Sequence, residues 1–332
     1  IEGTIKLYNN QVFIADNIKE VIPEFLMLLK GVIDCPDLPL NVSRSALQND
    51  GFVKKISEYI TKKVADKLAE MFKNDRENFV SKWDDIKMFI QFGMLTDEKF
   101  YEKAKDFALL KNLNGDYFTL EEYKDKVREK QVDKDGNMVI LYTQDADANY
   151  TYIERAKAKG YDVLLMNGEL DVHTMSQAEQ KNEKLRFVRV DSDTIENLIK
   201  KEETAKDNYS DEQKEGLRKA FEGMLPSSED KLRYFVTCEP AASDALPVFL
   251  TQNEFMRRMK EMAAHQQGMS FYGQMPDQYN LVINTAHPLI QELVSKMTSE
   301  EVQEEVEKKA EKEGEAPTKE TVIKTVYKLA DQ

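Results

Sequence analysis

The chain has 332 residues, which fits two typical domains or three small ones, and its 41% hydrophobic and 33% charged composition excludes disorder throughout. Its net charge of −14 makes nucleic acid and anionic membrane surfaces poor partners, and no apolar run approaches the ~20 residues needed to cross a bilayer. The two cysteines, Cys35 and Cys238, have the spacing of neither a disulfide scaffold nor a zinc site. We therefore expect a cytoplasmic protein.

The first 125 residues are predicted to begin as α/β structure and to finish mostly helical. Pro36 and Pro39 exclude a regular helix across the segment between them, and apolar residues then recur every four positions from Ile56 to Phe72, as on one stripe of a long helix. The expected elements are a strand or hairpin over residues 7–14, a short buried helix over 21–30 closed by Gly31, a long helix over 52–72, and helical faces over 83–90 and 100–110.

The segment from residue 126 to about 200 is predicted to be a compact α/β subdomain. Short apolar runs at 138–142, 161–166 and 186–190 alternate with helix-length stretches, a pattern typical of βαβ units and a small parallel sheet. The first run is followed by residues 143–147, which contain no glycine that would let a phosphate approach the backbone. This favours a packing unit over a nucleotide pocket.

The last part is predicted to be an α+β domain, separated from the subdomain by a charged stretch over 191–211. Glutamate and lysine dominate residues 298–320, which predicts a solvated arm, and a final amphipathic stripe follows. The expected elements are strands over 231–238, 246–251 and 279–284, a helix over 255–264, and the stripe of Val322, Ile323, Val326 and Tyr327.

Few residues carry an enzymatic signature. The sequence lacks a phosphate loop, a GxGxxG motif, a GxSxG elbow and HExxH, and its three histidines have no second ligand nearby, so we expect no metal site. Arg44 follows a proline-containing loop and could present a guanidinium to a phosphate, with Asn41 and Gln48 close by. Taken alone, the residues favour an ordinary pair between Arg44 and a carboxylate.

A second feature is a methionine-rich helix. Phe255, Met259 and Met262 occupy positions i, i+4 and i+7, with Met256 beside them. Methionine adapts to irregular partners, so such a stripe suits a promiscuous surface, although burial in a core is favoured without further context. The predicted polar side consists of Arg257, Arg258, Lys260 and Glu261.

Several motifs follow one family's order along nearly the whole chain. The longest is the run Leu38-Pro-Leu-Asn-Val-Ser-Arg-Ser-Ala-Leu-Gln48. The others are residues 12–16, 22–26, 30–34, 97–101, 118–123, 140–143, 160–163 and 283–288. In these motifs the chain closely resembles the ninety-kilodalton heat-shock protein chaperones, called HtpG in bacteria. The resemblance implies that an N-terminal ATP-binding domain should precede Ile1 and that a last dimerisation helix should follow Gln332.

The resemblance also implies roles for individual residues. Arg44 matches the arginine that a middle-domain loop supplies to the γ-phosphate of ATP held with Mg in the N-terminal domain, and Gln48 and Asn41 match its supporting residues. The family's amphipathic helix, which offers apolar residues to non-native client proteins, matches Phe255, Met256, Met259 and Met262. A homodimer would form through the C-terminal domain, weakened if only Val322, Ile323, Val326 and Tyr327 hold it.

One position departs from the family pattern. Bacterial relatives can show an exposed aromatic client contact in the small subdomain, where this sequence has His173.

By itself the chain is expected not to hydrolyse ATP and to hold no cofactor, because it would need its own N-terminal ATPase domain. Its partners would be client proteins, that domain and a second copy of the chain.

The predicted fold is therefore α/β and α+β, in an elongated chain of several subdomains. Two alternatives remain: a purely structural dimerisation scaffold whose methionine-rich helix is buried, and a self-contained α/β enzyme built on residues 126–200, which lacks a nucleophile and base. The predicted divisions are the end of a large αβα unit over 1–50, a helical connector over 51–125, the small subdomain over 126–208 and a truncated C-terminal domain over 209–332.

Overall fold

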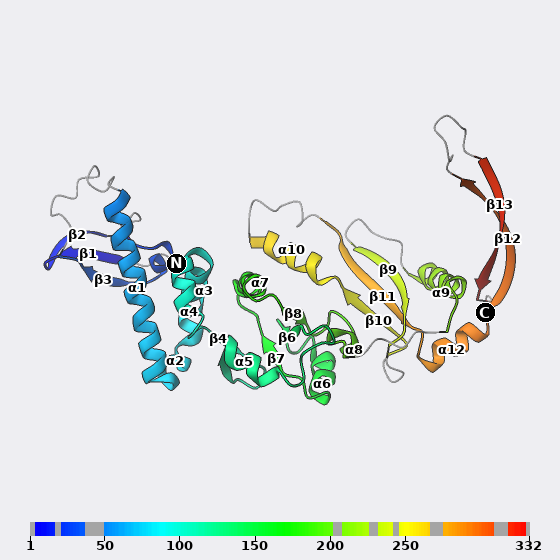
Figure 1. Ribbon diagram of the computed structural model, residues 1–332, viewed down its shortest axis with the longest axis horizontal. Coiled ribbons are helices and arrows are strands. Elements are labelled where there is room, and N and C mark those ends of the chain that lie inside the picture. Colours follow the sequence, from blue (N-terminus) through cyan, green and yellow to red (C-terminus); the bar gives the residue numbers. More distant parts are fainter. Residues whose placement is uncertain are drawn as a thin grey trace. The chain divides into compact units, whose positions relative to one another are not determined.

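The computed structural model describes residues 4–16, 21–36, 50–201, 208–225, 232–241, 246–265, 275–308 and 318–329 (Figure 1). The chain divides into two compact units. The first consists of Ile1–Gln131 and Ile140–Phe187, and the second of Val132–Val139 and Val188–Gln332. The mixed α/β content predicted from the sequence is confirmed, and the four-part division stays a prediction.

Up to residue 189 the elements are β1 (Ile5–Asn9), β2 (Val12–Asp16), the 3-10 helix η1 (Glu24–Leu28), β3 (Gly31–Asp34), α1 (Asp50–Asn74), α2 (Arg76–Ser81), α3 (Trp83–Thr96), α4 (Glu98–Ala104), β4 (Leu109–Lys111), β5 (Tyr117–Thr119), α5 (Leu120–Val127), β6 (Met138–Thr143), α6 (Tyr150–Ala158), β7 (Val163–Leu165), α7 (Asp171–Lys181) and β8 (Leu185–Arg189). They are followed by α8 (Ile195–Leu198), α9 (Asp211–Met224), β9 (Leu232–Glu239), β10 (Val248–Gln252), α10 (Glu254–His265), β11 (Asp277–Asn284), α12 (Pro288–Ser295), β12 (Thr298–Lys308) and β13 (Thr318–Lys328).

The N-terminal sheet has the strand order β2-β1-β3. The predicted hairpin is confirmed, since β1 pairs antiparallel with β2 through a turn in which Asn10 and Gln11 both have positive φ, 44° and 68°. The short buried helix predicted over 21–30 is confirmed in part, because Phe25 and Leu26 are buried on a helix there, but the helix is of the 3-10 type and Gly31 does not close it. Pro23 precedes a 3-10 helix of only five residues, and Gly31 opens β3 because this segment pairs in parallel with β1 instead of closing a helix.

The core of the first unit is rich in aromatic side chains. The predicted stripe of α1 is confirmed in part, because Ile56, Ile60 and Leu68 are buried. Trp83, the only tryptophan, is 1% exposed at the start of α3. The rings of Phe25 and Phe100 lie 4.6 Å apart, centroid to centroid. These side chains join η1, α1, α3 and α4 into one hydrophobic cluster.

A buried carboxylate links α3 to α7 within the first unit. Asp171 is fully buried, and its oxygens accept hydrogen bonds from the Gly168 amide at 2.8 Å, Gln91 Nε2 at 2.7 Å and Lys87 Nζ at 2.8 Å. Three donors, one of them cationic, compensate for the loss of water around the charge. Asp171 therefore helps to hold α7 on α3, together with the hydrogen bond from Gln177 Nε2 to the Met94 carbonyl at 2.7 Å.

The small sheet has the order β7-β6-β8, and its three strands lie on the three predicted apolar runs. β6 is buried along nearly its whole length and pairs in parallel with β7, with Leu141 opposite Val163. A strand covered on both faces needs the continuous apolar run seen at 138–142. This confirms the predicted α/β character of the segment.

The second unit contains a sheet of order β10-β11-β9 (Figure 1). The strands predicted near 231–238, 246–251 and 279–284 are confirmed, β11 pairing in parallel with β9 and antiparallel with β10. One face of this sheet packs against α9 and α12. Its buried cluster consists of Leu217, Val236, Ile283, Ile290 and Val294.

The C-terminal segment is a two-stranded hairpin. Residues 298–308 form a strand that pairs antiparallel with β13 from Thr298↔Lys328 to Lys308↔Thr318, and residues 298–301 are exposed, in agreement with the predicted solvated arm. The helical stripe predicted from Val322, Ile323, Val326 and Tyr327 is wrong because these residues lie on β13. Thr318, Thr321 and Thr325 accompany the valines and isoleucine, and such β-branched residues favour strands over helices.

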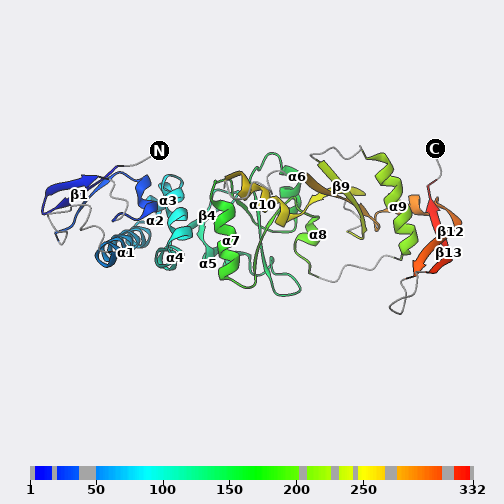
Figure 2. The same ribbon diagram turned by 90° about the horizontal axis from the view of Figure 1, so that it is seen from above.

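The hairpin of β12 and β13 packs against α9, and Figures 1 and 2 both draw them side by side. A Cβ on Gly216 of α9 would lie 2.5 Å from the Tyr327 carbonyl oxygen and 2.7 Å from Met297 Cε. A backbone atom cannot move aside as a flexible side chain can. Glycine at residue 216 therefore permits the close approach of helix and strand.

We expect Gly216→Ala to weaken the attachment of this hairpin by about 1–3 kcal/mol, the usual penalty for overpacking. Gly223→Ala is the matched control in the same helix, because a Cβ there would meet no atom within 4 Å. That variant should gain about 1 kcal/mol from helix propensity alone. Hydrogen exchange of residues 298–308 and 318–328 should speed up only in Gly216→Ala; equal exchange in both variants would contradict the packing role.

Candidate functional site

The predicted phosphate-directed residues Asn41, Arg44 and Gln48 lie outside the described residues. The chain enters this segment beside a cleft of about 630 Å³ in the first unit. Cys35 and Pro36 line the cleft just before the segment, and the first turns of α1 line it just after. Most of the lining is apolar, and three lysines border it: Lys30, Lys55 and Lys63.

The methionine-rich helix is α10, as predicted. It begins after Asn253, whose side-chain oxygen accepts a hydrogen bond from the Met256 amide at 3.1 Å and so caps the first turn. Phe255 is 62% exposed, and Met256, Met259 and Met262 are half-buried. A phenylalanine this exposed at the start of an amphipathic helix offers apolar area to solvent. We call these four residues the α10 surface.

The predicted polar side of α10 is buried at two positions. Arg257 and Arg258 are only 5% and 8% exposed. Both guanidinium groups bond Glu254 Oε1, from Arg257 Nη2 at 2.7 Å and from Arg258 Nε at 2.9 Å, and Arg257 also pairs with Glu261. Arg189 at the end of β8 lies 3.9 Å from Glu261.

This ionic network accounts for the orientation of α10. A buried guanidinium is costly to dehydrate unless carboxylates compensate it, and here two glutamates of the same helix do so. Lys260 adds a further pair with Asp277 of β11, at 2.5 Å. With its arginines held inward, the helix turns Phe255 outward. Sequence reasoning missed Arg189, because its partner Glu261 is distant in the chain and only the fold brings them together.

Of the four residues predicted for dimerisation, the structure describes the side chains of two. The side chains of Val322 and Ile323 lie outside the described residues, whereas Val326 and Tyr327 are half-buried on β13. Tyr327 approaches Gly216 of its own chain. His173, at the position where relatives can have an aromatic contact, is half-buried on α7.

Among the residues that the structure describes, no helix combines the length and apolarity needed to span a bilayer, and no group of three or more histidine, cysteine or acidic side chains is arranged to hold a metal ion.

Comparison with known proteins identifies the family. The model of the Hsp90 protein family matches residues 2–325, nearly the whole chain. The chain belongs to the Hsp90 family. Among its Hsp90 relatives, the chaperone protein HtpG of Bacteroides thetaiotaomicron is 52% identical over 293 residues, which cover 88% of this chain and 43% of that protein.

Other Hsp90 relatives also match most of this chain but less than half of their own length. The chaperone protein HtpG of Porphyromonas gingivalis is 53% identical over 290 residues, 87% of this chain and 42% of that protein. A more distant HtpG, from Bdellovibrio bacteriovorus, is 26% identical over 299 residues, 89% of this chain and 46% of that protein. The chain thus spans less than half the length of these relatives. The resemblance drawn from residues 38–48 and the other motifs is confirmed.

Proposed function

We propose that this chain is the client-binding part of an ATP-dependent molecular chaperone that works in the cytoplasm. In this proposal the α10 surface holds non-native or partly folded proteins and assists their folding. The relatives named above are chaperones, and their similarity to this chain supports the general function.

The observation that carries the client site is the exposure of Phe255. On an amphipathic helix made for a core, the apolar residues would be buried and the arginines solvated. Here Phe255 is 62% exposed, while Arg257 and Arg258 are at least nine-tenths buried. The three neighbouring methionines can adjust their rotamers to different partners, which suits clients of varied sequence. The alternative of a scaffold with a buried α10 is disfavoured by the same exposure.

We propose further that Arg44 acts on ATP bound, with Mg, by an N-terminal domain of the whole protein. Its planar, permanently charged fork can stabilise charge on a phosphoryl group that is being transferred. Asn41 and Gln48 would position it. The chain by itself would then have no ATPase activity, because the nucleotide would be held by another domain. Support for this proposal comes from the Leu38–Gln48 motif and the family membership.

We propose also that the whole protein is a homodimer joined through its C-terminal domain. Family membership supports this arrangement. Val322, Ile323, Val326 and Tyr327 would contribute from β13, so that the contact would involve a strand and not the helix expected from their spacing.

The client site can be tested by fluorescence anisotropy of a labelled, permanently unfolded protein titrated with the chain. The double variant Phe255→Glu, Met259→Glu should weaken binding by about tenfold or more, because charged groups would replace central apolar contacts. The matched control is Met224→Glu, Leu289→Glu, which changes two apolar residues of the same unit that are 74% and 57% exposed.

Circular dichroism should show that both double variants keep the helical content of the parent. Binding that is lost only in the α10 variant supports the client site. Equal binding by the two double variants, or no binding by the parent, would remove the α10 surface from the proposal.

A further inference from the structure

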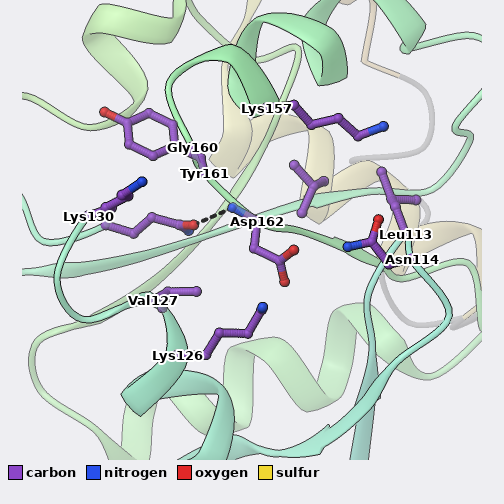
Figure 3. A pocket seen from close by; sticks show the side chains of 11 residues that line it. Leu113, Asn114, Lys126, Val127, Lys130, Lys157, Gly160, Tyr161 and Asp162 are labelled. Carbon is purple, nitrogen blue, oxygen red and sulfur yellow. Dashed lines mark hydrogen bonds between the residues drawn. The ribbon is translucent and has the colours of Figure 1, made fainter.

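A pocket of about 300 Å³ lies in the first unit, where three turns of the small α/β subdomain meet (Figure 3). Its walls come from three segments: Leu113 and Asn114 between β4 and β5, Lys126, Val127, Lys130 and Gln131 at the end of α5, and Lys157 and residues 160–163 from α6 to β7. This volume is at the lower end of the roughly 300–1,000 Å³ usual for small-molecule sites. It suits a compact ligand and not a polymer.

The walls are held by buried hydrogen bonds. Gln131 is 1% exposed, and its Oε1 accepts a hydrogen bond from the Asp162 amide at 2.7 Å, drawn as a dashed line in Figure 3. The Leu113 amide bonds the Val163 carbonyl at 3.0 Å. Gly160 has a φ of 75°, and a Cβ there would collide with the ammonium group of Lys130. The pocket is therefore preformed, with Lys130 lying against the backbone of residue 160.

Three lysines line this pocket, against one carboxylate. Lys126 lies over the Phe118 ring, 5.5 Å from its centroid, and among the described residues neither Lys126 nor Lys130 forms an ion pair with a carboxylate. Lys157 pairs with Glu154 at 3.1 Å. A local excess of positive charge stands out in a chain of net charge −14. All three lysines are exposed at the rim of one pocket, so each would attract an anion bound there.

Asp162 and Asn114 give the pocket a hydrogen-bond acceptor and an amide in addition to the lysines. Asp162 accepts a hydrogen bond from Asn112 Nδ2 at 3.2 Å, which leaves lone pairs available for a ligand's donor. In Figure 3 the Lys126 side chain extends toward this carboxylate, and the Asn114 amide faces the same space. Cations, an acceptor and an amide thus lie around one small cavity.

Helix dipoles can explain the positions of two of the three lysines. Lys126 and Lys157 stand in the last turns of α5 and α6, where lysines interact favourably with helix dipoles. Lys130 lies beyond the end of α5, so the dipole does not account for its place over Gly160. Nor does it explain why Asp162 and Asn114 share the cavity.

We propose that this pocket binds a small phosphate monoester that carries hydroxyl groups. Lys126 and Lys130 would bind the phosphate oxygens by charge-assisted hydrogen bonds. Asp162 would accept hydrogen bonds from hydroxyl groups and would repel a second anionic group, and Asn114 could donate to a hydroxyl or accept from it. This site is independent of the client-binding proposal.

Isothermal titration calorimetry of the whole chain tests the site with three probes: glucose 6-phosphate, glycerol 3-phosphate and inorganic phosphate. We expect saturable binding of both esters, tighter than that of inorganic phosphate. Lys126→Gln, Lys130→Gln should weaken ester binding by about tenfold or more, since two charged donors are lost. Lys73→Gln, Lys82→Gln is the control, with the same change of charge at two exposed lysines of this unit. It should bind like the parent.

Asp162→Asn tests the contact with the hydroxyl groups. Asparagine can still accept the bond from Asn112, so the walls should stay in place. We expect this variant to bind inorganic phosphate at least as tightly as the parent but to show a smaller preference for the esters, because an amide oxygen accepts from a hydroxyl group more weakly than a carboxylate does. Unchanged thermal unfolding, followed by Trp83 fluorescence, verifies folding of each variant. The proposal is overturned if no probe saturates, if the lysine variant binds like its control, or if inorganic phosphate binds as tightly as the esters.

Discussion

Replacement of Asp171 by alanine should remove about 3–5 kcal/mol from the free energy of unfolding of the first unit, because it breaks a buried charge pair and leaves its partners behind. Gln91 is 8% exposed and would lose its acceptor in a place that water scarcely reaches. The Gly168 amide would lose its bond at the start of α7. Lys87 is 20% exposed at its side chain and can partly regain water, which places the expected loss toward the lower end of the range.

The sequence provides a specific probe for this measurement. Trp83 is the only tryptophan, and it is buried in the same unit as Asp171, so urea unfolding followed by its fluorescence reports that unit alone. Asp171→Asn is the comparison variant, because it keeps one acceptor oxygen for Gln91 but loses the charge and turns the other oxygen into an NH2 group that faces Lys87 and the Gly168 amide. Its loss should be about half as large. An alanine variant within about 0.5 kcal/mol of the parent would show that the network does not hold α7 on α3.

In the full-length protein, Arg44→Ala should lower the kcat for ATP hydrolysis by about a hundredfold or more and change the KM by only a few-fold. The reason is that the guanidinium would interact mainly with charge that develops on the phosphoryl group in the transition state, and less with bound ATP.

Arg44→Lys gives the sharper comparison. It keeps the charge but loses the planar fork, so its kcat should lie between those of the parent and the alanine variant. Steady-state hydrolysis assays that find an unchanged kcat for Arg44→Ala, or a change confined to KM, would exclude Arg44 from the chemical step.

Features that depend on local pattern could be predicted from the sequence. The four-residue spacing from Ile56 to Phe72 is sufficient to identify α1, because one helix face carries all of these residues. The apolar run at 138–142 identifies β6, since a strand covered on both faces needs little else. The α10 helix was predicted as well, from Phe255 and the methionines.

Features that depend on partners distant in sequence could not be predicted. Arg257 and Arg258 have the composition of a solvated face, and no local signal shows that two glutamates and Arg189 compensate their burial. The β13 strand illustrates another difficulty. Val322, Ile323, Val326 and Tyr327 satisfy a helical spacing, but pairing with β12 along the whole strand overrides it.

The composition of the α10 surface has a consequence for its behaviour under oxidative stress. Three of its four side chains, those of Met256, Met259 and Met262, carry a thioether, and none of the three is fully buried. Oxidation to the sulfoxide would turn flexible apolar groups into polar ones, while Phe255 and the arginine–glutamate network beneath would keep their chemistry. The helix could thus lose most of its apolar character without unfolding, and enzymatic reduction of the sulfoxides would restore it.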